Sequence, residues 1–354
     1  MTECATAEAH GRVNLIGEHT DYHDGFVLPT IIPQLTRVEL TLRRDQRVRV
    51  TSPKVTSVPA MYDAGGEQPG RGWLDYVQGV TAMLARAGHR VPGFDLHIKS
   101  DIPVGAGLSS SAALTVSLLR GLRMLMEIGF DDVTLAKIAR SAETDFVGAP
   151  VGIMDQMACS LGRDGEALFL DTRTLATESL ALPASFELAV IDSGIEHRHA
   201  GGSYVDRRCE SFDAAARLGV RFLRDFDLSD LHRLAALPPL LARRARHIVT
   251  ENERVLAAVG ALRAGNVERL GDLLNESHRS LSNDYEVSTA NVDLLVSIAQ
   301  QHQAVYGARM TGGGFGGAII FLAQPGSGRD AAADICMAYA KRSGRKAVVL
   351  VSPP

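Results

Sequence analysis

The chain has 354 residues, of which 45% are hydrophobic and 22% charged, the balance of an ordinary globular protein. Its formal net charge is −4, so no overall positive field exists to attract nucleic acid or an acidic membrane surface. We therefore expect neither as a partner, and no run of roughly 18 apolar residues predicts a membrane-spanning helix.

The cysteines are spread widely along the chain, and no two of them form a C-x-x-C pair. This spacing argues against a disulfide framework and against a zinc cluster. We therefore expect reduced thiols and a cytoplasmic location. The residues concerned are Cys4, Cys159, Cys209 and Cys336.

In the first half of the chain, period-2 alternation indicates strands, helical spacing of apolar residues indicates helices, and Pro/Gly-rich stretches indicate loops. In chain order, these patterns predict strands at 37–50, a loop at 50–72, a helix at 73–88, a strand at 94–103, a glycine turn and helix at 104–129, and helical segments at 135–148 and 151–162.

The second half continues the mixture of strands and helices. The patterns predict strands at 166–175 and 186–195, amphipathic helices at 204–218, 245–264 and 266–281, and a glycine turn feeding a strand at 309–324. Strands and helices do not alternate regularly, which favours an α+β fold over a doubly wound sheet. A domain boundary is expected near residues 175–185.

The stretch "PVGAGLSSSAAL", residues 103–114, is the clearest candidate for a nucleotide site. Its small residues let backbone N–H groups approach an anion, and serines then open a helix whose N-terminus favours negative charge. The plainer alternative is a capped helix after a glycine turn. The stretch is not a Walker P-loop, because no G-K-[ST] follows it.

The stretch "GGGFGG", residues 312–317, matches G-x-G-x-x-G, but a strand follows it instead of a helix. This context argues against a dinucleotide site. Five glycines in six positions still imply close approach of the backbone, either to a ligand or to another segment of the chain. Taken alone, close packing of chain segments is the favoured interpretation.

Two acids stand on predicted helical segments. Asp155 lies in an apolar stretch, where most such acids are solvated or cap a neighbouring element. Buried beside an arginine, it would instead accept or orient a hydroxyl proton. Glu143 has the plain alternative of a surface charge, but together with Ser111 it offers the oxygen ligands that Mg²⁺ prefers.

The segment "GRVNLIGEHTDYHDG", residues 11–25, combines core-forming Leu15 and Ile16 with many titratable side chains. A core strand cannot hold so many unpaired titratable groups, and an exposed loop has no need of the apolar ones. A molecule outside the chain is therefore expected to satisfy the polar groups. They are Arg12, Glu18, His19, Asp21, His23 and Asp24.

Four segments in this order, "GRVNLIGEHTDYHDGFVLP", "PVGAGLSSSAAL", "GIMDQ" and "RMTGGGFGG", resemble the signatures of galactokinases, which are small-molecule kinases of the GHMP superfamily. The resemblance extends from Gly11 to about Leu322. The first segment is specific to galactokinases, whereas mevalonate and homoserine kinases share the Gly/Ser loop.

The resemblance implies the two-domain α+β fold of GHMP kinases, with the active site in the cleft between the domains. Residues 1–178 would form the N-terminal domain, which carries the sugar-recognition segment and the phosphate-binding loop. Residues 179–354 would form the C-terminal domain with the GGGFGG loop. The sequence leaves the oligomeric state open, and a monomer is compatible with it.

The resemblance also implies roles for individual residues. The phosphates of ATP would be bound by Gly105, Ala106, Gly107, Leu108, Ser109, Ser110 and Ser111, and Trp73 and Tyr76 would lie near the adenine. Ser111 and Glu143 match the Mg²⁺ ligands. Sugar-contacting positions are matched by Arg12, Glu18, His19, Asp21, Gly152, Asp155 and Tyr204. Asp155 matches the catalytic base, and Arg12 matches the cation paired with it.

The implied reaction transfers the γ-phosphoryl group of ATP to the anomeric O1 of galactose. Galactokinases usually have asparagine where His23 stands, and residues 52–70 are compact, which leaves room for another sugar such as N-acetylgalactosamine or a higher sugar. A non-catalytic sensor of galactose and ATP is a further alternative. Such sensors lose residues of the serine loop, which is intact here.

Overall fold

The computed structural model describes residues 3–195 and 200–351. The chain divides into two compact units, which are described separately. Unit 1 contains residues 1–12, 31–104 and 108–162, and unit 2 contains residues 13–30, 105–107 and 163–354. The domain division at residues 178 and 179 stays a prediction. No helix in the described part of the chain is long and apolar enough to cross a membrane.

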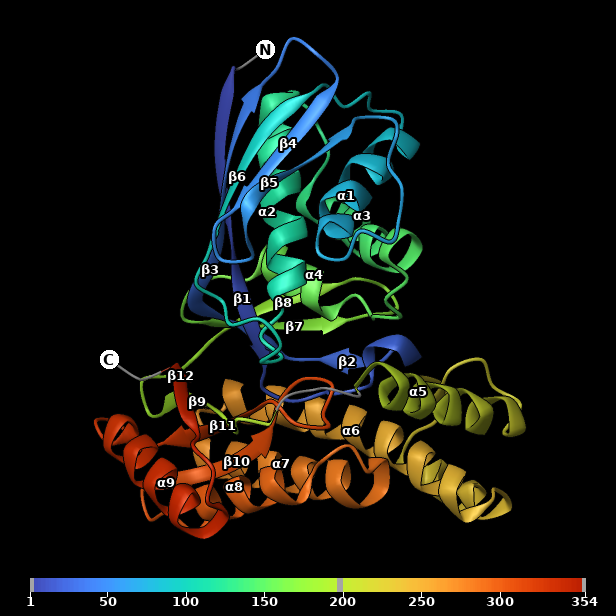
Figure 1. Ribbon diagram of the computed structural model, residues 1–354. Coiled ribbons are helices and arrows are strands. Elements are labelled where there is room, and N and C mark those ends of the chain that lie inside the picture. The colour runs from blue at the N-terminus through green and yellow to red at the C-terminus, as the bar shows by residue number, and fades with distance from the viewer. Residues whose placement is uncertain (1–2, 196–199, 352–354) are drawn as a thin grey trace. The chain divides into compact units, whose positions relative to one another are not determined.

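Unit 1 is built on a sheet whose strands follow the spatial order β1, β3, β6, β4, β5 (Figure 1). The strands are β1 (Cys4–Asn14), β3 (Pro29–Leu42), β4 (Arg47–Ser52), β5 (Thr56–Asp63) and β6 (Phe94–Ser100), of which β1 and β3 also extend into unit 2 in sequence. β3 pairs with β6 and β4 with β5 in antiparallel register, whereas β4 and β6 run parallel.

Helices of unit 1 pack against one another beside this sheet (Figure 1). They are α1 (Leu74–Arg86), α2 (Ser110–Leu125), α3 (Asp132–Ser141), the π-helical turn η2 (Ala142–Val147) and α4 (Met154–Leu161). Gly121 brings α2 close to the sheet, because a Cβ atom there would lie 2.4 Å from a methyl carbon of Leu40.

Unit 2 contains a four-stranded antiparallel sheet in the order β10, β11, β9, β12. These strands are β9 (Glu187–Asp192), β10 (Val305–Met310), β11 (Ala318–Ala323) and β12 (Val348–Val351). Every residue of β11 is buried, so this strand lies at the centre of the core. A second antiparallel group joins β2 (Phe26–Val27), β7 (Glu166–Asp171) and β8 (Thr177–Ala181).

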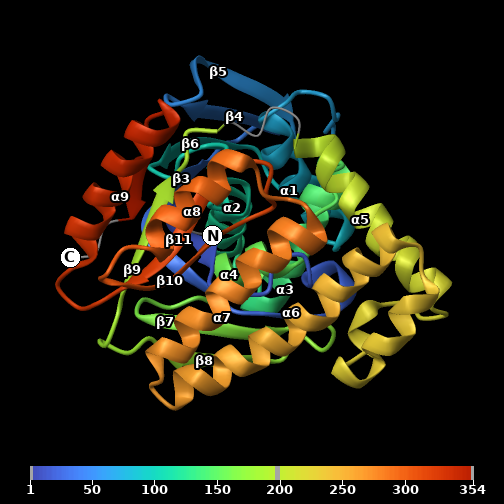
Figure 2. The same ribbon diagram turned by 90° about the horizontal axis from the view of Figure 1, so that it is seen from below.

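The helices of unit 2 pack against the four-stranded sheet and against one another (Figure 2). They are α5 (Ala200–Arg217), α6 (Pro239–Arg263), α7 (Val267–Ser280), the π-helical turn η5 (Leu281–Tyr285), α8 (Ala290–Gln300) and α9 (Gly328–Ser343). Short 3₁₀ turns add η1 (Asp21–His23), η3 (Leu223–Asp225) and η4 (Leu228–Ala236).

The predicted mixture of strands and helices is confirmed, and two of the differences involve proline. The predicted loop at 50–72 contains strand β5, which carries Pro59. Proline is tolerated there because β5 lies at the edge of the sheet, where one missing N–H breaks no internal pairing. Helix α6 begins at Pro239 instead of residue 245, because proline is well suited to the first turn of a helix.

Candidate active site

Arg12 and Asp155, the predicted catalytic pair, meet within unit 1. Asp155 lies in the first turn of α4, and Arg12 lies on β1. The guanidinium donates twice to Asp155 Oδ1, from Nε at 2.9 Å and from Nη2 at 2.6 Å. The arginine side chain is 5% exposed, whereas that of Asp155 is 27% exposed. The ion pair therefore fixes a carboxylate that solvent still reaches.

Ser109 completes the setting of Asp155. Its hydroxyl donates to Asp155 Oδ2 at 2.7 Å, so each carboxylate oxygen has a partner. Ser109 precedes α2 in a left-handed conformation with φ 61°, and its side chain does not cap the helix. A residue held in this rarely adopted backbone region is typical of a functional site. The sequence predicted Ser109 as a phosphate-binding residue and gave no sign of the bond to Asp155.

Glu143 lies in the π-helical turn η2 and is 2% exposed. Gln156 Nε2 donates to its Oε1 at 2.8 Å, and the hydroxyls of Thr115 and Ser111 also hydrogen-bond to it. Burial raises the pKa of Glu143 to about 7 against the opposing effect of these bonds. Ser111 and Glu143, the predicted Mg²⁺ ligands, therefore lie together, and Gln156 connects them to α4.

The predicted adenine residues open helix α1. Trp73 is the N-cap residue, and Tyr76 lies in the first turn; both are partly buried. The pKa of the Tyr76 phenol is raised by burial and, to a smaller extent, by the negative charge of Glu143. Tyr76 is therefore close enough to the Ser111–Glu143 pair to sense its charge. The adenine contacts themselves stay a prediction.

The predicted phosphate-binding loop has the backbone freedom that its glycines imply. Gly105 adopts φ 79° and Gly107 φ 75°, in the left-handed region that favours glycine. A Cβ atom on Gly105 would meet no other atom within 4 Å. The side chains of Ala106 and Leu108 are buried, and the Leu108 carbonyl accepts a hydrogen bond from the Arg12 backbone N–H at 3.2 Å. Leu108 thereby anchors the strand that carries Arg12, the predicted partner of the catalytic base.

Glu18 is held inside unit 2 by the end of β10 and the glycine turn. Its Oε1 accepts the backbone N–H of Gly312 at 2.8 Å and the hydroxyl of Thr311 at 3.2 Å. The guanidinium of buried Arg309 lies 3.4 Å from the same oxygen. Glu18 is 2% exposed, so these contacts compensate a charge that burial would otherwise disfavour.

The glycine turn at residues 312–317 packs closely against other segments of unit 2. A Cβ atom on Gly314 would lie 2.5 Å from the Val287 carbonyl oxygen, and one on Gly316 would lie 2.6 Å from that of Ile195. Both glycines have positive φ. The packing interpretation of this motif is therefore confirmed, and the Gly312 N–H adds a polar contact to Glu18 that the sequence did not reveal.

His19 forms an aromatic cluster in unit 2. Its ring lies 5.5 Å from Tyr204 and 4.7 Å from Tyr285, measured between centroids, and its Nδ1 is 2.9 Å from the Tyr22 hydroxyl. Burial, with the nearby His247 and Arg309, lowers the pKa of His19 to about 3, so the imidazole is neutral. The predicted sugar residues His19 and Tyr204 are thus neighbours.

Two predicted sugar residues have less definite surroundings. Asp21 is half-buried at the start of η1. Gly152 is buried in the loop that precedes α4, three positions before Asp155. Sequence reasoning missed several residues that position the predicted ones. They are Tyr22, Gln156, His247, Tyr285, Arg309 and Thr311. Most of them bond to partners more than 200 residues away in sequence, whereas Gln156 lies 13 residues from Glu143 and Tyr22 lies three from His19.

Family models match three parts of the chain. The galactokinase galactose-binding signature matches residues 2–41, the GHMP kinases N terminal domain matches residues 75–163, and the GHMP kinases C terminal domain matches residues 258–341. A mevalonate kinase from Methanococcus jannaschii has the same fold, with a TM-score of 0.71 at 16% identity over 97% of this chain and 96% of that one. These matches define a kinase with the GHMP fold, as the sequence predicted.

Full-length relatives narrow the class further. Galactokinases of Roseiflexus sp. and Chloroflexus aggregans are 42% and 43% identical over 97% and 98% of this chain, and over 89% and 90% of their own lengths. The structure of Lactococcus lactis galactokinase complexed with galactose aligns with a TM-score of 0.95 at 33% identity, covering 99% of this chain and 94% of that one. The chain belongs to the galactokinase family. It is accordingly a phosphotransferase of the sugar-kinase class, with ATP as its phosphoryl donor.

Proposed function

We propose that the chain transfers the γ-phosphoryl group of ATP to the anomeric hydroxyl of galactose, giving galactose 1-phosphate and ADP. The observation that carries the proposal is the setting of Asp155, whose two oxygens accept hydrogen bonds from Arg12 and Ser109 while 27% of its side chain stays exposed. Relatives named galactokinase, at 42–43% identity over nearly the whole chain, support galactose as the acceptor.

Asp155 acts as the base in this proposal. Each carboxylate oxygen offers two lone pairs, so Oδ2 can accept the O1–H proton of the sugar while it keeps the hydrogen bond from Ser109. The O1 oxygen attacks the γ-phosphorus, the bond to the β-phosphate oxygen breaks, and ADP leaves with the electron pair. The proton remains on Asp155 until solvent removes it. Arg12 offsets negative charge next to the reacting oxygen.

Recognition of the sugar is assigned to Arg12, Glu18, His19, Asp21, Gly152, Asp155 and Tyr204. A hexose presents a ring of hydroxyls that each donate and accept, so binding it requires polar groups in fixed positions. The contacts that hold Glu18 meet this requirement, since a carboxylate clamped by Gly312 and Thr311 cannot turn to suit another epimer. A wrong hydroxyl would leave buried polar groups unpaired, which discriminates strongly between sugars.

ATP is assigned to the glycine–serine loop and to helix α1. Residues 105–111 would surround the phosphates, with the N-terminus of α2 facing them, and Trp73 and Tyr76 would flank the adenine. Positive φ at Gly105 and the open space around it support close approach of an anion to the backbone.

Ser111 and Glu143 fit a magnesium ion chemically. Both supply oxygen, and Glu143 is a buried carboxylate that takes part in no salt bridge within residues 3–195 and 200–351. A divalent cation would compensate the charge that burial disfavours. When bound, Mg²⁺ neutralises charge on the ATP phosphates. The pair would hold such an ion next to Gln156, whose neighbour in the chain is Asp155.

A panel of sugars tests the proposal. Purified protein is given Mg²⁺-ATP with galactose, glucose, N-acetylgalactosamine or a heptose, ADP release is followed by a coupled assay, and NMR of the product locates the phosphate. We expect ADP release with galactose and phosphate on O1. If only a different sugar of the panel were phosphorylated, that sugar would replace galactose as the proposed substrate. Binding of galactose without ADP release would favour the non-catalytic sensor. The cytoplasmic location stays a prediction, and the oligomeric state stays open.

A further inference from the structure

His23 closes turn η1 and is completely buried, with a partner for each ring nitrogen. Its Nε2 lies 2.8 Å from the Ser211 hydroxyl oxygen, and that hydroxyl donates to the Arg208 carbonyl at 2.8 Å. His23 Nε2 therefore carries the proton that it donates to Ser211. The backbone N–H of Leu223 donates to His23 Nδ1 over 3.4 Å. The ring is a donor on one side and an acceptor on the other.

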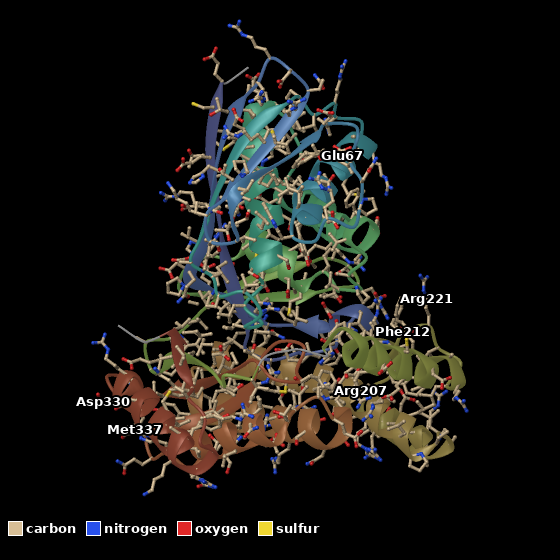
Figure 3. The ribbon with its side chains drawn as sticks, viewed as in Figure 1. Glu67, Arg207, Phe212, Arg221, Asp330 and Met337 are labelled. Atoms are coloured by element: carbon tan, nitrogen blue, oxygen red, sulfur yellow. The ribbon has the colours of Figure 1, made fainter. Side chains whose placement is uncertain are left out.

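The faces of the His23 ring are also covered. The Phe212 ring lies 4.3 Å away between centroids at an interplanar angle of 30°, and the Tyr22 ring lies 5.4 Å away. The Arg208 guanidinium lies 5.6 Å from both of these aromatic rings. Burial, with a smaller effect of Arg208, lowers the pKa of His23 to about 3, so the ring is neutral at ordinary pH. Figure 3 labels Phe212 on α5.

Helix α5 is held by contacts at several points, but few of its own side chains are buried. The buried Arg244 guanidinium donates to Glu210 at 2.7 Å, and the Tyr285 hydroxyl donates to the Arg207 carbonyl at 3.3 Å. Among residues 202–217, only Ser211, Ala214 and Ala215 are buried, and residues 202–210 contribute none. Tyr204 precedes Ser211 by seven residues, which is two helical turns, so the two side chains lie on the same face. The bond between His23 and Ser211 is made by a buried α5 side chain on the face that presents Tyr204, so it contributes to the position and rotation of that face.

We propose that His23 is a positioning residue for sugar binding, which fixes α5 through Ser211 and Phe212 so that Tyr204 is held against His19. The inference rests on the proposed function, because it treats Tyr204 and His19 as sugar contacts. His23 does not touch the sugar, since its surface is buried and both nitrogens are engaged.

Steady-state kinetics of Ser211→Ala and His23→Ala test the inference. We expect the KM for galactose to rise about five- to tenfold, as for loss of one or two hydrogen bonds, with kcat and the KM for ATP within about twofold of wild type. A merely destabilised enzyme would not separate the two KM values in this way. His23→Asn, which keeps a donor and an acceptor, should recover part of the loss. An unchanged galactose KM in folded Ser211→Ala would overturn the inference.

Two further measurements keep the test decisive. The double variant His23→Ala/Ser211→Ala should be no worse than the more affected single variant, because both remove one interaction, and additive effects would contradict the link. Asp213→Ala is the matched control: it removes an exposed ion pair with Arg217 on the same helix and should leave galactose KM unchanged.

Amide hydrogen exchange separates this inference from the proposed function. In Ser211→Ala, amides of residues 202–210 should exchange faster, while those in the centre of α6 keep wild-type protection. This readout does not depend on turnover, so it stands even if the wild-type protein releases no ADP with galactose. Wild-type exchange rates over residues 202–210 in both His23→Ala and Ser211→Ala would refute the positioning role.

Discussion

Asp155 and Glu143 are two carboxylates of unit 1 that contrast in almost every respect. Asp155 is partly exposed, has the Arg12 guanidinium at 2.6 Å, and needs no further cation. Glu143 is 2% exposed and receives its described hydrogen bonds from neutral groups. The two sites adjoin through α4, because Asp155 and Gln156 are consecutive.

The contrast supports two different proposed roles for these acids. Arg12 compensates the charge of Asp155. The exposed part of the Asp155 carboxylate can therefore accept a proton from a bound hydroxyl. Glu143 has no such cationic partner within residues 3–195 and 200–351, and burial raises its pKa. Its buried negative charge would be stabilised by a bound cation or removed by a proton. We therefore propose proton transfer for Asp155 and cation binding for Glu143.

Asp155→Asn should have the largest effect. The amide keeps the shape of the side chain but cannot take the O1 proton, so we expect kcat to fall by about 10²- to 10⁴-fold. Binding of ATP, measured by calorimetry, should be retained, because Asp155 does not belong to the predicted nucleotide-binding residues. The measurement is kcat from ADP release at saturating galactose.

Asp145→Asn is the control for this variant, since it neutralises an exposed acid two residues from Glu143. It should leave kcat within about twofold of wild type. Near-normal turnover in Asp155→Asn would show that Asp155 is not the base. The proposed difference in role between Asp155 and Glu143 would then be wrong.

The pH dependence of stability tests the proposed role of Glu143. The pKa of Glu143 is raised from 4.5 to about 7 in the folded state, so between these values the folded protein keeps a proton that the unfolded chain has lost. Without metal, the free energy of unfolding therefore falls as the pH rises from 4.5 to 7. The total loss, reached above pH 7, is about 3 kcal/mol at most. Mg²⁺ should restore this stability, so MgCl₂ should raise Tm more at pH 8 than at pH 6.

Thermal unfolding of Glu143→Gln provides the comparison. The neutral amide has no charge to desolvate, so both the fall in stability with pH and the response to MgCl₂ should be smaller than in wild type. An equal Mg²⁺ response in the two proteins at pH 8 would place the ion elsewhere.

Ser109→Ala should have the smallest effect. Asp155 would lose the hydrogen bond on Oδ2 but stay paired with Arg12, so we expect kcat to fall by up to about tenfold. The variant is measured in the same ADP assay. Ser117→Ala is the matched control, because it removes a hydroxyl of α2 that bonds only to the Leu114 carbonyl among its described contacts. Equal kcat values for the two variants would mean that Ser109 does not orient the base.

Local patterns predicted much of the fold. The apolar spacing at 73–88 predicted α1 to within two residues, and the glycine–serine stretch correctly predicted the start of α2. Helices α8 and α9 were missed. Helix α9 is rich in alanine and has few large apolar residues at helical spacing, so its burial against β9 comes from tertiary packing.

Contacts in the candidate site could be predicted from the sequence where both residues belong to motifs shared with galactokinases. The pairing of Arg12 with Asp155 followed from resemblance and is present at 2.6 Å. The clamp on Glu18 was not predictable, because its partners Thr311 and Gly312 lie more than 290 residues away in sequence. The role of Ser109 was also hidden, since a serine before a helix ordinarily caps it.

The edge strand β5 has a consequence for behaviour at high concentration. The edge strand of a sheet can pair with a strand of another molecule. Val58 on this edge is 69% exposed, so it adds apolar surface to which another chain can bind. Pro59, the next residue, lacks an N–H and interrupts the row of donors that an incoming strand would need. Pro59 therefore removes one donor from this edge strand, and we expect Pro59→Thr to increase self-association at high protein concentration.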